Sequence, residues 1–303
     1  MRRPFLPLLP LLSLVLGGAA TAHAQLVPAR DLFRFPLGSM DRAPALGASV
    51  GDGLGNPAAV ALPVGARALA GAAALQTPGD IGVRGQLLAA AGALPGGLTV
   101  ALSLAHLSVD DLVRTETDPQ TVGDEIPYST SLYSVAVARR NARHVSTGLA
   151  LRYRQGRLDD VNEGAFYVDG GVFAEHLPFR DASLGAATFL WRPGHTDEEP
   201  LTVNLAADLR VLGPDDAHQL RAGYSLSVLG PHRREHFGFG VVRYGIWEGR
   251  AGLAKAEEYG GQPWRTRLGL LVDYAPYAVG VAREENGAGL GASYQFTLRA
   301  TIR

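Results

Sequence analysis

Apolar and polar residues alternate along much of this chain, so that every second side chain is large and apolar. A period of two predicts β-strands with one apolar and one polar face. The alternation is cleanest in residues 145–153, 203–211, 220–228, 268–274 and 294–302. Turn signals rich in Gly, Pro and Asp separate these stretches. From Gly65 onward we count roughly fourteen strands of about 10 residues, the length with which a tilted strand crosses a bilayer.

A few segments depart from this pattern. Residues 163–174 and 181–192 carry large side chains on both faces, and in 237–246 the apolar phase slips between Val241 and Val242. A slip of one residue predicts a β-bulge there. Residues 110–127 form the longest predicted loop, which is acidic and which we expect on the extracellular side.

The two parts of the chain before Gly65 look different from the strands and from each other. Residues 1–24 combine a basic start, a short apolar run and a final Ala-His-Ala, which predicts a cleaved secretory signal peptide. The alternative of a retained anchor is disfavoured because the apolar run is too short to span a bilayer. Residues 25–64 carry five prolines and a glycine-rich run. We interpret them as an N-terminal extension or a plug.

The composition narrows the class of barrel. The chain is 47% hydrophobic and 19% charged, yet its apolar residues stand at alternate positions and not in helix-length blocks. Tyr and Trp recur near strand ends, as in the aromatic girdles of membrane barrels. These features favour an all-β, transmembrane antiparallel β-barrel in residues 65–303 over a soluble β-sandwich. The final strand runs to the end of the sequence, as in many outer-membrane proteins, but it ends in Arg303 and not in an aromatic residue.

Charged side chains in mid-strand are the candidate functional residues. A charge facing lipid at mid-membrane costs roughly 2–4 kcal/mol, so we expect these side chains to face the lumen. Two interpretations stay open, a solute path and ion pairs that fill and brace a closed barrel. The predicted set is Arg152, Asp208, Arg210, Arg221, Arg267, Asp273 and Arg299.

Other chemistry is poorly supported. The absence of cysteine excludes disulfides, lipid attachment to cysteine and thiol catalysis. Basic and acidic residues number 28 and 29, which predicts no nucleic-acid-binding face. Residues 47–51 match the esterase pattern G-x-S-x-G and residues 232–236 the zinc-protease pattern H-x-x-E-H, but both lack the helix that these sites need. We interpret the acidic stretch 197–199 as a solvated loop. We therefore expect no enzyme activity, no metal and no cofactor.

The sequence resembles the PorV/PorQ family of outer-membrane proteins, relatives of the FadL-type transporters. The likeness rests on Gly65-Ala66-Arg67-Ala68-Leu69-Ala70-Gly71-Ala72, similar to the opening strand of that family, and on the layout of about fourteen strands. The family has an Asn-Pro-Ala-Gly element after this strand, whereas here Asn56-Pro57-Ala58 precedes it. The resemblance implies a barrel that carries hydrophobic solutes or one that serves a secretion system.

Three functional hypotheses follow. The first is FadL-like passage of hydrophobic or amphipathic small molecules, the second a non-transporting scaffold or shuttle for protein secretion, and the third, least favoured, an outer-membrane enzyme. The expected location is the outer membrane after export through the Sec pathway. The expected partners are outer-membrane lipids and lipopolysaccharide, the barrel-assembly machinery and, under the second hypothesis, secretion-system components. A plug inside the lumen favours the first hypothesis, and a lumen closed by paired charges with large ordered outer loops favours the second.

Overall fold

The computed structural model describes residues 26–47, 51–62, 65–79, 81–114, 124–142, 144–194, 199–230, 233–257, 264–285 and 291–303. The predicted signal peptide lies outside these residues, as do Ser49 of the esterase-like pattern and His232 of the zinc-protease-like pattern. Within the described part of the chain, no helix is long and apolar enough to cross a membrane.

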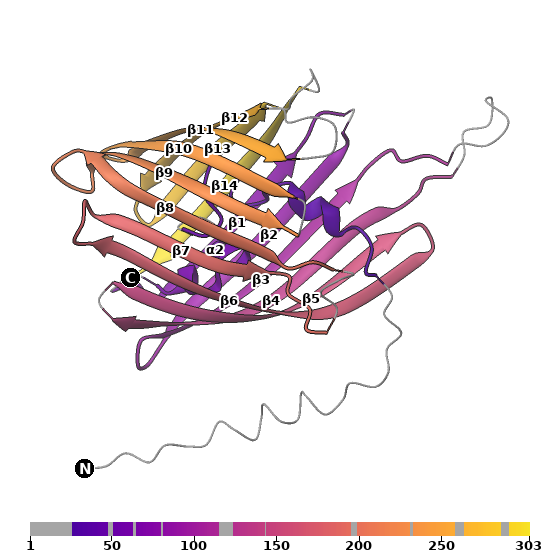
Figure 1. The fold of residues 1–303 in the computed structure, drawn as a ribbon, viewed down its shortest axis with the longest axis horizontal. Coiled ribbons are helices and arrows are strands. Elements are labelled where there is room, and N and C mark those ends of the chain that lie inside the picture. Colours follow the sequence, from indigo (N-terminus) through magenta and orange to yellow (C-terminus); the bar gives the residue numbers. More distant parts are fainter. Residues whose placement is uncertain are drawn as a thin grey trace, which may run out of the picture.

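Fourteen antiparallel strands form a closed barrel in which each strand pairs with its neighbours in sequence and β1 pairs with β14 (Figure 1). This confirms the predicted fold class and strand number. The first seven strands are β1 (Ala68–Gln76), β2 (Val83–Leu94), β3 (Leu98–Val109), β4 (Tyr128–Ala142), β5 (Val145–Leu158), β6 (Val161–Leu177) and β7 (Ala182–Phe189). The last seven are β8 (Thr202–Leu212), β9 (His218–Leu229), β10 (Arg234–Tyr244), β11 (Trp247–Glu257), β12 (Trp264–Tyr274), β13 (Tyr277–Glu285) and β14 (Ala292–Ile302).

The outer face of the barrel is apolar along its strands. On β5, Leu149 is 66% exposed while its neighbour Ala150 is 2% exposed, so the large apolar side chains point away from the lumen. Tyr244, Trp247 and Tyr274 are exposed beside two short turns at one end of the barrel, where an aromatic girdle is expected. Tyr128 differs, because its hydroxyl donates a hydrogen bond to Asp31 of the N-terminal segment.

The bulge predicted at Val241 and Val242 is wrong. The pairing of β10 with both β9 and β11 runs through these residues without a register shift, and the shifts lie elsewhere, for example between Arg140 and Ala142. The prediction assumed a polar lumen. In the structure Val241 faces inward and packs against an apolar cluster, so both faces of β10 are apolar at this point.

The described residues between 26 and 62 lie inside the barrel, and we call residues 26–62 the plug segment. In Figure 1 it is the indigo stretch between the barrel walls. It contains three short helices, η1 (Arg30–Arg34), α2 (Asp52–Gly55) and η2 (Pro57–Val60). Its apolar side chains form shared cores with the inner wall, including Leu32 and Met40, which are 2% and 0% exposed. Burying such a side chain contributes roughly 1.5–3 kcal/mol, so the plug segment and the wall stabilise each other.

Glycines on the inner wall let the plug backbone approach closely. A Cβ atom on Gly148 of β5 would collide with the backbone of Pro57 and Ala58, and one on Gly185 of β7 would collide with the carbonyl of Ala45. Asn56 sits at the same contact, where its side-chain amide donates to the carbonyls of Ala45 (2.7 Å) and Val172 (3.1 Å). These residues fix the segment around η2 to the wall formed by β5–β7.

The glycine contact predicts the effect of a single methyl group. Gly148→Ala is expected to displace η2 and destabilise the plugged barrel by about 1–3 kcal/mol, because backbone atoms must move to make room. Gly170 of β6 is the matched control, since a Cβ there meets just one side-chain atom of Leu149 at 3.7 Å. The midpoint of urea unfolding in detergent measures both variants. An equal effect of the two substitutions would contradict the close approach.

Candidate functional site: a chamber between plug and wall

A chamber of about 810 Å³ lies between the plug segment and the inner wall formed by β7–β12. The residues around η1 line one side of it and side chains from β7, β8, β9, β11 and β12 line the other. A volume of this size is typical of a small-molecule site, which spans roughly 300–1,000 Å³. The lumen is therefore plugged but not completely filled.

Much of the chamber wall is apolar. Phe33 of the plug segment packs edge-on against Phe189 of β7, with ring centroids 5.7 Å apart. Leu37 and Leu54 of the plug segment and Leu190, which follows β7, extend this surface. The aromatic and aliphatic groups offer a contact surface for an apolar ligand.

Buried ion pairs close one side of the chamber. The carboxylate of Glu199, which is 2% exposed, accepts hydrogen bonds from Arg154 (2.7 Å) and from the hydroxyl of Tyr167. Arg154 of β5 also donates to the plug carbonyls of Val27 (2.8 Å) and Pro28 (2.7 Å). Glu199 was predicted in a solvated acidic loop, and that prediction is wrong. Glu199 and Pro200, just before β8, lie against the plug segment, where Arg30 donates to the carbonyl of Pro200 (2.6 Å).

Positive charges gather at another part of the chamber lining. Arg34 at the end of η1, Arg233 just before β10 and Arg265 of β12 all line it. Partial burial lowers the pKa of Arg233, and the neighbouring guanidinium groups of Arg34 and Arg265 lower it further against the opposing effect of Glu235. Arg265 is paired with Glu235 at 2.6 Å. The carboxylates of Asp31 and Glu235, which also line the chamber, offset part of this positive charge.

The mid-strand charges predicted from the sequence all form ion pairs in the structure. Arg152 of β5 is completely buried and pairs with Asp169 of β6 at 2.5 Å. Arg267 of β12 is 2% exposed and pairs with Glu235 (3.0 Å) and Glu284. Asp273 of β12 pairs with Arg299 of β14 (3.2 Å) and with Arg243 of β10 (3.4 Å).

The other three predicted charges meet in one cluster at the end of β8 and β9. Arg221 bridges Asp208 (2.6 Å) and Asp181 (2.9 Å), and Arg210 also pairs with Asp181 (2.7 Å). Burial opposes ionisation of Asp181, but hydrogen bonds from His176, Arg210 and Arg221 together hold its pKa below the usual value. These ladders brace the wall.

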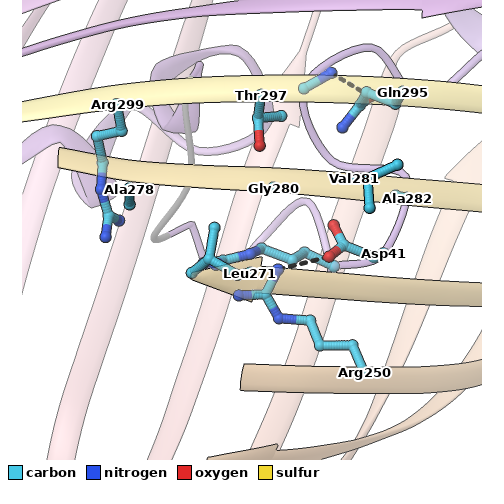
Figure 2. A pocket seen from close by; sticks show the side chains of 12 residues that line it. Asp41, Arg250, Leu271, Ala278, Gly280, Val281, Ala282, Gln295, Thr297 and Arg299 are labelled. Atoms are coloured by element: carbon cyan, nitrogen blue, oxygen red, sulfur yellow. Dashed lines mark hydrogen bonds and ion pairs between the residues drawn. The ribbon is translucent and has the colours of Figure 1, made fainter. Parts of the chain in front are cut away.

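A second, smaller cavity lies between Gly38–Arg42 of the plug segment, which we call the plug loop, and strands β11–β14. Its space for water-sized molecules is about 20 Å³, enough for one or two waters. Figure 2 shows Gln295 and Thr297 extending from β14 toward the plug loop, with Asp41 of that loop paired to Arg250 of β11 at 2.6 Å. Ala278 and Ala282, with their methyl side chains, and the backbone of Gly280 form part of its wall on β13.

Sequence reasoning missed several of these residues for identifiable reasons. Arg154 lies at an inward position of β5, two residues after Arg152, but was not singled out. Glu235 was considered as part of H-x-x-E-H. In the structure Glu235 pairs with Arg265 and Arg267 in the lumen, while the next residue, His236, contacts Tyr224, whose outward-facing ring is 50% exposed. The two residues therefore lie on opposite faces of the strand, so Glu235 is not placed to act as a general base beside a metal held by His236.

Comparisons with known proteins show a likeness of fold. No family model matches the chain, and no curated protein sequence matches it either. Among solved structures, the toluene transporter TodX from Pseudomonas putida is 12% identical, with a TM-score of 0.53, and the match covers 87% of this chain and 95% of that one. A TodX deltaS2S3 mutant, described as a monoaromatic hydrocarbon channel, is 11% identical, with a TM-score of 0.58, covering 87% and 97%. The chain therefore has the barrel fold of TodX, while the resemblance to the PorV/PorQ family and to the FadL-type transporters stays a prediction.

Proposed function

We propose that this protein is an outer-membrane channel for hydrophobic or amphipathic small molecules, which enter the chamber between the plug segment and the wall. The chamber of about 810 Å³ is the observation that carries the proposal. A barrel braced purely as a scaffold has no need for an apolar hollow of ligand size. The apolar outer face supports placement in a membrane, because exposed Leu, Val and aromatic side chains line nearly every strand.

The lining of the chamber favours amphipathic solutes. Phe33, Phe189 and Leu190 offer apolar contact, while Arg34 and Arg233 offer positive charge on the same lining. A molecule with an apolar body and an anionic or polar head satisfies both parts. TodX, whose fold this chain shares, is described as a toluene transporter, which supports the apolar part of this substrate class.

The second candidate, a non-transporting barrel for a secretion system, is favoured by one observation. All seven predicted mid-strand charges are paired with each other or with other lumen residues. Paired charges are compatible with a lumen that is closed and with a lumen that conducts. The location of the plug segment inside the barrel, beside an open chamber, gives the first candidate the stronger support.

A cavity-filling substitution tests the proposal. Ala256 of β11 lines the chamber and is 7% exposed, so Ala256→Phe is expected to occupy the space that a solute needs. Leu253→Phe, on the outer face of the same strand, is the matched control. We expect radiolabelled laurate to enter vesicles with a lipopolysaccharide outer leaflet through the wild type and the control, and about tenfold more slowly through Ala256→Phe. Wild-type flux equal to that of protein-free vesicles would contradict the proposal.

A further inference from the structure

The plug segment is held differently on its two sides. On β5–β7 its backbone lies against wall glycines such as Gly148 and Gly185, and wall arginines donate to its carbonyls, as Arg152 does to Leu54 (2.9 Å). Separating these surfaces would expose backbone groups on both sides. Toward β11–β14 side chains make the polar contacts: the carboxylate of Asp41 pairs with Arg250 (2.6 Å), and the side-chain oxygen of Gln295 accepts a hydrogen bond from the backbone N–H of Gly38 (2.8 Å).

The second side also carries unfilled space and an unsatisfied polar group. Gln295 is 1% exposed, and its Oε1 accepts the hydrogen bond from the backbone N–H of Gly38. Among the described residues its Nε2 has no hydrogen-bond partner, and Figure 2 shows this nitrogen directed into the small cavity. A buried amide donor without an acceptor is destabilising, because it has lost its hydrogen bond to water and gained none in the protein. The contact between the plug segment and β14 is therefore weaker at Gln295, where the small cavity begins.

The chamber and the small cavity are separated by a single stretch of plug backbone. Leu37 and Ser39 line the chamber, whereas Gly38, between them, lines the small cavity. Gly38 has φ of 85°, a conformation that favours glycine. From there the small cavity follows β13 and β14 past Thr297 to Ala278 and Arg299, near the end of the barrel where β12 turns into β13. A shift of this one stretch would join the two spaces.

We propose that solutes leave the chamber along the interface between plug residues 38–42 and strands β11–β14, which we call the seam. Gln295, Asp41 and Arg250 make the contacts that close the seam, and we call these three residues the latch. Thr297 sets the width of the seam. This inference rests on the proposed function. It assigns the moving contact to one side of the plug segment, while the side against β5–β7 stays in place. Neighbouring Arg42, which pairs with Glu248 at 3.7 Å, belongs to the same side-chain-mediated contact.

Substitutions at Thr297 test the route. Thr297→Phe places a ring in the seam and is expected to lower laurate flux about tenfold, by the same cavity-filling argument as for Ala256→Phe. Thr297→Val keeps the size and should leave flux within about twofold of the wild type. Val279→Phe, on the outer face of β13, controls for added bulk in this part of the barrel. Equal flux through Thr297→Phe and Thr297→Val, with both barrels folded, would overturn the route.

A reversible cross-link gives a second test, in which one double variant is compared in its oxidised and reduced forms. The chain has no cysteine, and a Cβ on Gly269 of β12 would lie 2.7 Å from the Cβ of Asp41. Asp41→Cys with Gly269→Cys therefore needs a small movement of the plug loop to reach the Cβ spacing of about 3.8 Å in a disulfide. Oxidation is expected to stop laurate flux and reduction to restore it. Unchanged flux through the oxidised protein would refute the seam, whereas absence of flux through the wild type would instead refute the proposed function.

Discussion

Removal of residues 26–62 is expected to raise the ion conductance of the barrel by about tenfold or more. Eight-stranded barrels are filled by their own side chains and barrels of 16–18 strands hold water channels. A barrel of fourteen strands therefore depends on its plug segment for closure. Planar-bilayer recordings of the intact and the truncated protein measure the difference.

The truncated barrel must first be shown to fold. A heat-dependent shift in gel mobility is the control for a closed barrel in both proteins. Gly148→Ala, which displaces η2 without shortening the chain, should raise conductance in the same direction. A folded truncated barrel that conducts no better than the intact protein would mean that the wall itself closes the lumen.

Replacement of Arg154 by Met is expected to destabilise the plugged barrel by about 3–5 kcal/mol. Arg154 is completely buried and binds Glu199 together with the carbonyls of Val27 and Pro28. Its loss leaves a buried carboxylate and two plug carbonyls without this donor. The midpoint of urea unfolding in detergent measures the effect.

The double variant Arg154→Met with Glu199→Met is the control for this prediction. It removes both charges of the pair, so its destabilisation should be clearly smaller than that of Arg154→Met alone. If the double variant is as unstable as the single one, the bonds to the plug carbonyls outweigh the ion pair. If Arg154→Met unfolds at the wild-type midpoint, the network does not hold the plug segment.

The strands were predictable because large apolar side chains stand at every second residue and share the outer face of the barrel. Leu149, Leu151 and Tyr153 of β5 illustrate this, since all three are at least partly exposed on the outer face. The inward charges were predictable for the same reason, because a charge such as Arg152 cannot face an apolar exterior without large cost. The period-two pattern is sufficient to predict the strands, and the cost of placing a charge in apolar surroundings is sufficient to predict which way the charged side chains face.

The contents of the lumen were less predictable because they depend on contacts between residues far apart in sequence. Phe237 and Val241 face inward and interrupt the apolar–polar alternation of β10, because the plug residues Ala43 and Ala45 supply an apolar partner there. Glu199 has the local sequence of an acidic loop and becomes buried through Arg154, which is 45 residues away. Gly148 gave no local signal that Pro57 would lie against it.

The most direct test of a plugged, solute-conducting lumen is laurate flux into vesicles with a lipopolysaccharide outer leaflet, measured for the intact protein and for the protein without residues 26–62. The account predicts saturable flux through the intact protein, because a solute must occupy the chamber and pass the latch. It predicts faster flux that does not saturate through the truncated barrel. No flux through either form, with both barrels folded, would contradict the account.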